Sequence, residues 1–258
     1  MVCQYVADVV ARFGGGAPQH LFLAGGLFAN VRVNQKIAEL PSAKSVYIFP
    51  NMSDAGLNLG AAMIYGFTHG GFRNRFDVSN LYWGRPFTDE DIEAELRAAG
   101  VPYRRPASLA RAVAALIRGK KVVGRFGGAM EYGPRALGNR SIIYSAEDPS
   151  VNQWLNTRLN RTEFMPFAPY VRDVDVPEYF QVPSGELKPY LFMTMTCDVT
   201  ERCRREAPGI VHVDGTARPQ IVFRNEKPRE AIQTFRQGRL DVLAIGGFIV
   251  ERQDPPAT

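Results

Sequence analysis

Five arginines lie close together in the middle of the sequence, among glycines and asparagines. They fall in two stretches, residues 125–141 and 156–169, and they are Arg125, Arg135, Arg140, Arg158 and Arg161. Guanidinium groups are permanently charged and donate paired hydrogen bonds that match the oxygens of phosphate or carbamate. Glycine lets backbone amides approach a ligand closely, and successive amides in such turns form anion-binding concavities. The two stretches therefore predict an oxyanion-binding site.

Glu131 lies inside this basic field, where its carboxylate can orient an arginine or bind an amino group. The alternative interpretation is a glycine-rich hairpin whose arginines are solvated or paired with carboxylates. For one isolated arginine that alternative would be favoured. The density of arginine, glycine and asparagine in a single loop favours the anion site.

Three longer motifs carry a resemblance to a known family. They read MEYGPRALGNRS at 130–141, NRTEFMPFAP at 160–169 and HVDGTARPQ at 212–220. In this order they resemble the C-terminal domain of the nodulation-type and antibiotic O-carbamoyltransferases. The resemblance covers almost the whole chain, and we expect the chain to be part of a longer family protein.

The resemblance implies a two-step reaction. The C-terminal domain would make a carbamoyl adenylate from carbamoyl phosphate and ATP, and an actin-like domain would pass the carbamoyl group to a small hydroxyl acceptor. Such chemistry needs positioning and charge neutralisation more than a protein nucleophile, and Mg²⁺ would accompany ATP. The residues expected to bind and orient the substrates are Arg125, Glu131, Arg135, Arg140, Asn160, Arg161, His212 and Arg218, with Gly133 and Asn139 at the nucleotide. For His212, substrate contact and structural hydrogen bonding stay open as alternatives.

Two shorter motifs near the N-terminus resemble the second lobe of the family's actin-like ATPase domain. The first is Gly25-Gly26 with Asn30, which in the family lines the nucleotide pocket. The second is SDAG at 53–56, whose aspartate, Asp54, corresponds to a ligand of the active-site metal. A glycine pair after a strand is weak evidence, and an aspartate at a helix start is usually only a cap. Their occurrence together, ahead of the arginine-rich domain, favours the functional interpretation.

Paired histidines supply the other metal ligands in a complete family member. This chain has only His20, His69 and His212, and none lies three or four residues from another. Because a transition metal needs three or more protein ligands, we expect iron or another divalent metal to bind only when a first lobe is supplied. A separate chain or a second copy would have to provide it. The family's Asn-Thr-Ser-Phe-Asn motif before the last helix is also absent.

The expected fold is α/β (α+β), in two parts. Residues 1–72 predict a partial actin-like lobe, 73–82 a linker, and 83–258 a domain that resembles the mixed-sheet threonylcarbamoyl-adenylate-synthase-like fold. The expected helices lie at 2–13, 29–40, after Ser53 or Asp54, 89–99, 108–118, 149–159 and 228–235. The expected strands lie at 21–24, 46–49, 121–126, 141–144, 190–197, 210–213, 217–223, 240–245 and 248–250. The small residues Gly56, Gly60, Ala61 and Ala62 would let the third helix pack closely.

Composition narrows the function classes. The chain is 45% hydrophobic and 22% charged, as in soluble globular proteins. A net charge of +5 suits an anionic ligand but does not demand nucleic acid, which is disfavoured. No apolar run reaches the roughly 18 residues of a membrane span, and no leader is recognised. Three cysteines without CxxC spacing predict neither disulfides nor zinc and fit a reducing cytoplasm.

A second hypothesis from another class remains: a non-catalytic module that holds carbamoyl phosphate or nucleotide and acts only with a partner chain. A basic RNA-binding module ranks third. Without the first lobe, we expect apolar surface around Gly25 and Ala61 to be exposed, which favours self-association or poor solubility.

Overall fold

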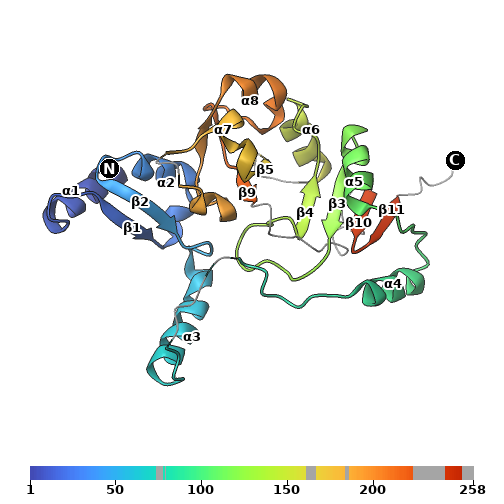
Figure 1. The fold of residues 1–258 in the computed structure, drawn as a ribbon, viewed down its shortest axis with the longest axis horizontal. Helices are drawn as coiled ribbons and strands as arrows, with labels where there is room; N and C mark the ends of the chain where they lie inside the picture. Colours follow the sequence, from blue (N-terminus) through green and yellow to red (C-terminus); the bar gives the residue numbers. More distant parts are fainter. Residues whose placement is uncertain (74–77, 79, 161–166, 184–185, 223–241, 252–258) are drawn as a thin grey trace. The chain divides into compact units, whose positions relative to one another are not determined.

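The computed structural model describes residues 1–73, 78, 80–160, 167–183, 186–222 and 242–251 of the chain (Figure 1). The chain forms two compact units. The first comprises Met1–Asn80 and Pro166–Arg224, and the second comprises Leu81–Met165 and Asn225–Thr258. This division differs from the linear order expected from the sequence, because 166–224 packs with the N-terminal segment. The family-domain boundary at 73–82 stays a prediction.

The N-terminal half of the first unit is an α/β arrangement. Its elements are α1 (Val2–Phe13), β1 (Gln19–Leu23), η1 (Gly26–Ala29), α2 (Val31–Ala38) and β2 (Ala43–Ile48). β1 and β2 are parallel, as a strand–helix–strand unit requires. Asn30 caps α2: its Oδ1 accepts hydrogen bonds from the N–H groups of Arg32 and Val33, at 3.2 Å each. The sequence predicted α1, β1, α2 and β2 but not the 3-10 turn η1.

The third helix differs from its expected surroundings. A 3-10 turn, η2 (Asp54–Gly56), leads into α3 (Leu57–Thr68), and the Ser53 side chain makes no capping hydrogen bond. A methyl group added at Gly60 would meet nothing within 4 Å, and Ala61 and Ala62 are exposed. In Figure 1, α3 runs away from β1 and β2. Gly60, Ala61 and Ala62 thus pack against no other described element, whereas a methyl group at Gly56 would clash with Asn51 O.

The C-terminal half of the first unit consists of short elements. They are β5 (Tyr170–Arg172), η3 (Asp173–Asp175), α7 (Val176–Tyr179), β6 (Phe180–Gln181), η5 (Lys188–Phe192), β7 (Cys197–Val199), α8 (Glu201–Glu206), η6 (Pro208–Ile210), β8 (Thr216–Ala217) and β9 (Gln220–Val222). β5 pairs with β9, and β7 lies between β6 and β8. The expected strand 190–197 was wrong over most of its length, because Met193 adopts a left-handed conformation (φ 53°) after η5. The expected strand 210–213 was wrong too, because a 3-10 turn and a tight turn occupy it.

The second unit contains a four-stranded sheet in the order β11-β10-β3-β4. Its elements are α4 (Asp89–Ala98), α5 (Leu109–Arg118), β3 (Val123–Phe126), β4 (Arg140–Ile143), α6 (Val151–Arg158), β10 (Val242–Ile245) and β11 (Phe248–Glu251). Alternate residues of β10 face opposite sides: Val242 and Ala244 pack toward α5, and Leu243 and Ile245 pack toward α4. Thr88 and Asp91 form the capping box that begins α4.

The sequence predicted α4, α5, α6, β3 and β4 within two residues at either end. The expected helix 228–235 lies outside the described residues. None of the described helices combines the length and apolarity that a membrane crossing needs.

Candidate functional site

The loop between β3 and β4 holds most of the predicted anion site. In its sheet β3 lies between β10 and β4. It pairs with β4 so that Arg125 lies opposite Ser141 and Phe126 opposite Arg140. Between the strands the chain adopts positive φ at Gly128 (67°), Gly133 (112°) and Gly138 (105°). Residues with a side chain rarely adopt these angles, so glycine sets the path of the loop.

Glu131 organises this loop from within. Its Oε1 accepts hydrogen bonds from three backbone N–H groups, those of Leu137 (2.8 Å), Asn139 (2.7 Å) and Arg140 (3.2 Å). The sequence led us to expect Glu131 to orient an arginine or bind an amino group. The structure shows its Oε1 fixing the backbone of the 137–140 turn, and the expected contact with an arginine or amino group stays a prediction.

Asn139 also braces the loop. It is almost fully buried, and its Nδ2 donates to Ala129 O at 2.8 Å, which ties the two sides of the loop together. Arg125 Nε donates to Gly138 O at 3.0 Å. The Arg140 guanidinium carbon lies 3.8 Å from the centre of the Phe126 ring. This cation–π contact holds the Arg140 side chain against the ring. These contacts preorganise the loop.

Arg135 differs from the other loop residues. Its side chain is half-buried, and burial lowers the pKa of its guanidinium below the ordinary value. Its Nε is shielded from solvent and has no hydrogen-bond partner among the residues that the structure describes. A buried N–H of a cation without a partner is costly, and an anion would remove that cost. Exposed Gly133, Pro134 and Ala136 surround it in the chain, so a ligand has access.

The second arginine stretch is only partly described. Asn160 follows α6 in a left-handed conformation (φ 52°) and is exposed. Arg161 and the rest of 161–166 lie outside the described residues. The expected roles of Asn160 and Arg161 stay predictions.

The N-terminal motifs lie in the first unit. Gly25 has φ 113° and donates its N–H to Met52 O at 2.6 Å. A methyl group at Gly25 or Gly26 would meet nothing within 4 Å, so both backbones are open to a ligand. The Oδ1 of Asn30 already caps α2, which leaves its amide nitrogen for other contacts.

Asp54, the predicted metal ligand, is exposed at the first residue of η2. Across the described part of the chain, no three His, Cys, Asp or Glu side chains gather as a metal site. His20 bonds to Ser45 through Nδ1, and His69 bonds to Thr68 in the same way. The donors present here therefore do not fit a transition metal by themselves.

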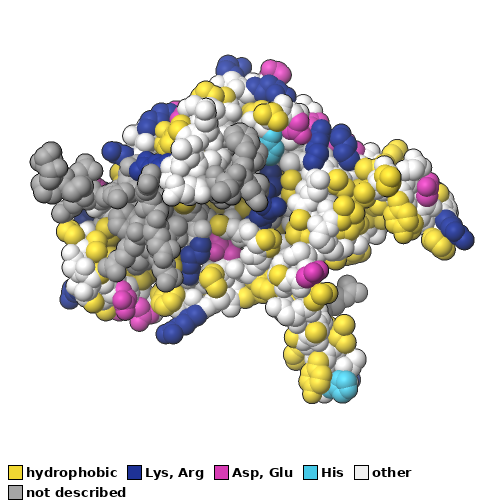
Figure 2. Space-filling model, turned by 180° about the vertical axis from the view of Figure 1, so that it is seen from behind, with side chains coloured by type: hydrophobic (Ala, Val, Ile, Leu, Met, Phe, Trp, Pro, Cys, Tyr) yellow, Lys and Arg dark blue, Asp and Glu magenta, His cyan; other side chains and the backbone are white. Residues whose placement is uncertain are grey.

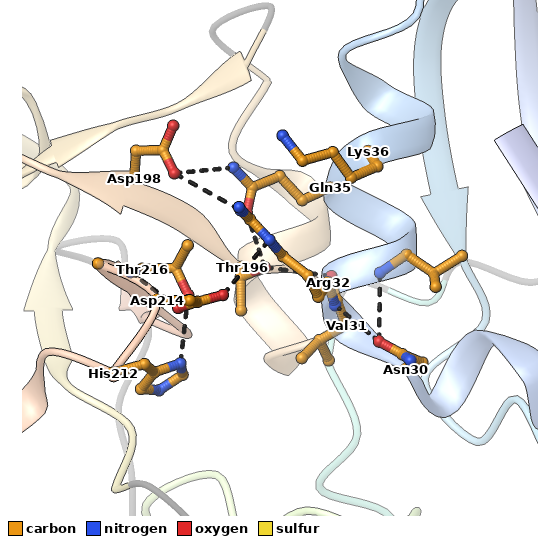
Figure 3. A network of polar contacts seen from close by, with 12 residues as sticks. Asn30, Val31, Arg32, Gln35, Lys36, Thr196, Asp198, His212, Asp214 and Thr216 are labelled. Carbon is orange, nitrogen blue, oxygen red and sulfur yellow. Dashed lines mark hydrogen bonds and ion pairs between the residues drawn. The ribbon is translucent and has the colours of Figure 1, made fainter.

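The third motif forms a tight turn whose side chains contact α2 (Figure 3). Gly215 N donates to His212 O at 2.9 Å, and His212 N donates to Thr216 O at 2.8 Å. Asp214 Oδ2 lies 3.4 Å from Arg32 Nε. The Asp-Gly turn was predicted, but its contact with Arg32 was not.

Further polar contacts hold α2 against β7. Gln35 is buried, and its Oε1 accepts from Arg32 and from Thr196, each at 2.7 Å. Arg32 also lies 3.5 Å from Asp198. The only sequence signal for these contacts was the spacing of Arg32 and Gln35, which places the two residues on one face of a helix. Nothing in the sequence indicated their partners, which lie more than 160 residues further along the chain.

Burial lowers the pKa of His212, so its imidazole is neutral near pH 7. Although burial acts in the opposite direction, hydrogen bonds from Thr216 and the charge of Arg32 hold the pKa of Asp214 below its ordinary value. Arg218 is half-buried between β8 and β9.

The predicted site residues divide between the two units. The first unit contains Gly25, Gly26, Asn30, Asp54, His212 and Arg218, and the second contains Arg125, Glu131, Gly133, Arg135, Asn139, Arg140, Asn160 and Arg161.

Comparison with known proteins gives two family matches and several relatives. Residues 2–63 match the model "Carbamoyltransferase N-terminus", and residues 114–230 match the model "Carbamoyltransferase C-terminus". The chain is 34% identical to nodulation protein NolNO of Sinorhizobium fredii over 85% of its length, and 34% identical to an uncharacterized protein of Methanocaldococcus jannaschii over 88%. It is 32% identical to nodulation protein NolO of Bradyrhizobium diazoefficiens over 90%.

The chain spans only part of these relatives: 33%, 37% and 49% of their respective lengths. The comparison with NolO extends over 271 positions although the chain has 258 residues, so that relative has residues within the matched region that this chain lacks. Both family models nevertheless match in the expected order and together account for most of the chain. The chain belongs to the carbamoyltransferase family.

Proposed function

We propose that this chain supplies the carbamoyl-activating part of an ATP-dependent O-carbamoyltransferase that acts in the cytoplasm. In this reaction carbamoyl phosphate, ATP and water give carbamoyl adenylate, inorganic phosphate and pyrophosphate. The carbamoyl group then passes to the hydroxyl of a small acceptor, and AMP leaves. Mg²⁺ bound to the ATP phosphates would neutralise part of their charge.

The observation that carries this proposal is the half-buried guanidinium of Arg135 in a preorganised loop. Its Nε lacks a hydrogen-bond partner among the described residues, and Glu131 fixes the neighbouring backbone. Substrate phosphates carry the oxygens that such a group binds. No nucleophilic side chain is needed for the activation step, because fixed positive charge stabilises the charge that develops on the phosphoryl group.

Pyrophosphate exchange tests this activity directly. With carbamoyl phosphate and Mg²⁺ present, the purified chain should incorporate labelled pyrophosphate into ATP, and omission of carbamoyl phosphate should abolish the exchange. The second candidate is a non-catalytic module that binds the same ligands. Asp54 is exposed, and among the described residues no three His, Cys, Asp or Glu side chains gather as a metal site, which favours that candidate. Ligand binding without exchange would establish the module and refute the activating enzyme.

The second half-reaction needs a partner in our proposal. Hydrophobic side chains cover the projecting helix α3 (Figure 2), and Leu57, Ile64 and Tyr65 are 70%, 66% and 67% exposed. Exposed apolar surface of this extent marks an interaction site. The occupant we propose is an actin-like first lobe of the family, because the relatives are two to three times as long as this chain.

We expect the chain by itself to bind iron weakly and to transfer no carbamoyl group to an acceptor. Addition of a relative's first lobe as a separate polypeptide should produce a stoichiometric complex and tight metal binding, measured by gel filtration and metal analysis. Leu57→Ser combined with Ile64→Ser should weaken the complex, whereas Ala62→Ser, on a different face of the same helix, should not. A chain that binds one iron and transfers carbamoyl groups unaided would contradict this prediction, and a stable homodimer would replace the lobe with a second copy.

A further inference from the structure

The turn at 212–216 brings three side chains into one row. The two backbone hydrogen bonds between His212 and the residues that follow it close the turn, and Gly215 has φ 77°. As a result His212 and Thr216 lie side by side, with His212 Nδ1 3.3 Å from Thr216 Oγ1 (Figure 3). On its other side, Thr216 Oγ1 lies 2.7 Å from Asp214 Oδ1.

A count of hydrogens assigns the tautomer of His212. An ionised carboxylate only accepts hydrogen bonds, so the single hydroxyl proton of Thr216 must point to Asp214. The hydroxyl oxygen can then only accept from His212. Nδ1 of His212 must therefore carry the ring proton, and Nε2 keeps its lone pair. Nε2 makes no hydrogen bond within the part of the chain that the structure describes.

Arg32 fixes the far end of this row. Its Nε contacts Asp214, and its Nη1 is held by Gln35 Oε1 at 2.7 Å and by Asp198 at 3.5 Å. The guanidinium keeps the Asp214 carboxylate ionised and in place. The row therefore runs from α2 through Asp214 and Thr216 to the imidazole of His212.

The surroundings of His212 favour the neutral ring. Burial is the largest influence and lowers its pKa; Asp214 acts to raise the pKa, and Arg218 acts to lower it. A neutral ring with a fixed Nδ1 proton offers one acceptor atom to a ligand. Nε2 can accept a hydrogen bond from a donor group of the ligand. Because a positively charged donor would be repelled by the nearby Arg32 and Arg218, an uncharged donor is favoured.

We propose that Arg32, Asp214 and Thr216 are positioning residues that fix His212 as the Nδ1–H tautomer, so that Nε2 accepts a hydrogen bond from an uncharged donor of the substrate. The donor is the carbamoyl amino group or a ribose hydroxyl, and this assignment of the ligand rests on the proposed function. In this proposal both roles considered for His212 hold at once, because Nδ1 makes a structural hydrogen bond and Nε2 contacts the substrate.

Nitrogen-15 NMR of the three histidines tests the tautomer without any ligand. His212 should show a protonated Nδ1 and an unprotonated Nε2, with a pKa below the ordinary value of 6.5. Asp214→Ala frees the Thr216 proton to point at Nδ1, so the ring proton should move to Nε2; Asp214→Asn keeps an acceptor and should preserve the wild-type tautomer. Arg32→Met should raise the Nε2–H share. Thr68→Val, at the matching exposed pair with His69, should leave the His212 signals unchanged.

Two ligand pairs then identify the donor. Acetyl phosphate replaces the amino group of carbamoyl phosphate by methyl, and 2′,3′-dideoxy-ATP lacks the ribose hydroxyls of ATP. Wild type should prefer the donor-bearing member of one pair by about fivefold, and His212→Phe should lose that preference. Equal preferences in both proteins would overturn the ligand contact, and an Nε2–H tautomer in wild type would overturn the positioning. If the wild-type protein binds none of the four ligands, the proposed function is refuted. The NMR measurement still decides the tautomer, because it needs no ligand.

Discussion

Arg135→Ala should weaken binding of carbamoyl phosphate and ATP by roughly ten- to a hundredfold, and should reduce pyrophosphate exchange at subsaturating ligand by a similar factor. The physical reason is that the lost contact is a charge-assisted hydrogen bond from a partly desolvated guanidinium, worth about 1.5–3 kcal/mol. Because burial already lowers the pKa of Arg135, the free protein has a desolvated cation that the ligand relieves. Isothermal titration calorimetry measures the change in affinity.

Arg118→Ala provides the matched control. Arg118 lies in the same unit, is exposed at the end of α5, and carries the same charge, so both variants lower the net charge equally. Arg135→Lys should recover only part of the affinity, because a lysine cannot donate two parallel hydrogen bonds. Equal affinities in Arg135→Ala and Arg118→Ala would show that the loop is not the anion site.

Glu131→Ala should loosen the whole loop. Three backbone N–H groups lose a charged acceptor, and each such hydrogen bond contributes about 1.5–3 kcal/mol before water replaces part of it. We expect the amides of Leu137, Asn139 and Arg140 to exchange with solvent hydrogen at least tenfold faster. Ligand affinity should fall as well, although Glu131 itself contacts backbone and not ligand in our proposal.

Glu131→Gln separates geometry from charge. The glutamine Oε1 can accept the same hydrogen bonds, so protection of the three amides should be largely retained. The strands β10 and β11 serve as an internal reference, because their exchange should be unchanged in both variants. Loss of ligand binding in Glu131→Gln with full amide protection would return Glu131 to the role first expected from the sequence, a direct contact with a substrate amino group.

Local sequence signals predicted the elements whose ends are chemically marked. Asn30, Thr88 and Ser108 each cap the helix that follows, through side-chain hydrogen bonds to its first turn. The apolar spacing of α5 likewise matches the residues that pack on the sheet. Such signals lie within a few residues of the structure they specify, so one sequence suffices to find them.

The same reasoning failed where the structure depends on distant residues. The stretch 190–213 contains apolar runs typical of strands, but 3-10 turns and the helix α8 occupy much of it, and only Cys197–Val199 pairs as a strand. The contact of Arg32 with Asp214 likewise joins residues far apart in the chain. The arginine-rich loop was predicted as an anion site from composition, but the role of Glu131 within it was not, because backbone hydrogen bonds leave no trace in residue types.

The position of β3 has a consequence for synthesis on the ribosome. One edge of β3 pairs with β4, which follows within twenty residues, but its other edge pairs with β10, which emerges more than a hundred residues later. Until β10 arrives, a nascent chain exposes an unpaired strand edge directly before the arginine-rich loop, and such edges recruit other strands. Translation that stalls before residue 242 would leave a polypeptide with every arginine of the loop present, no completed sheet beneath them, and a strong tendency to aggregate.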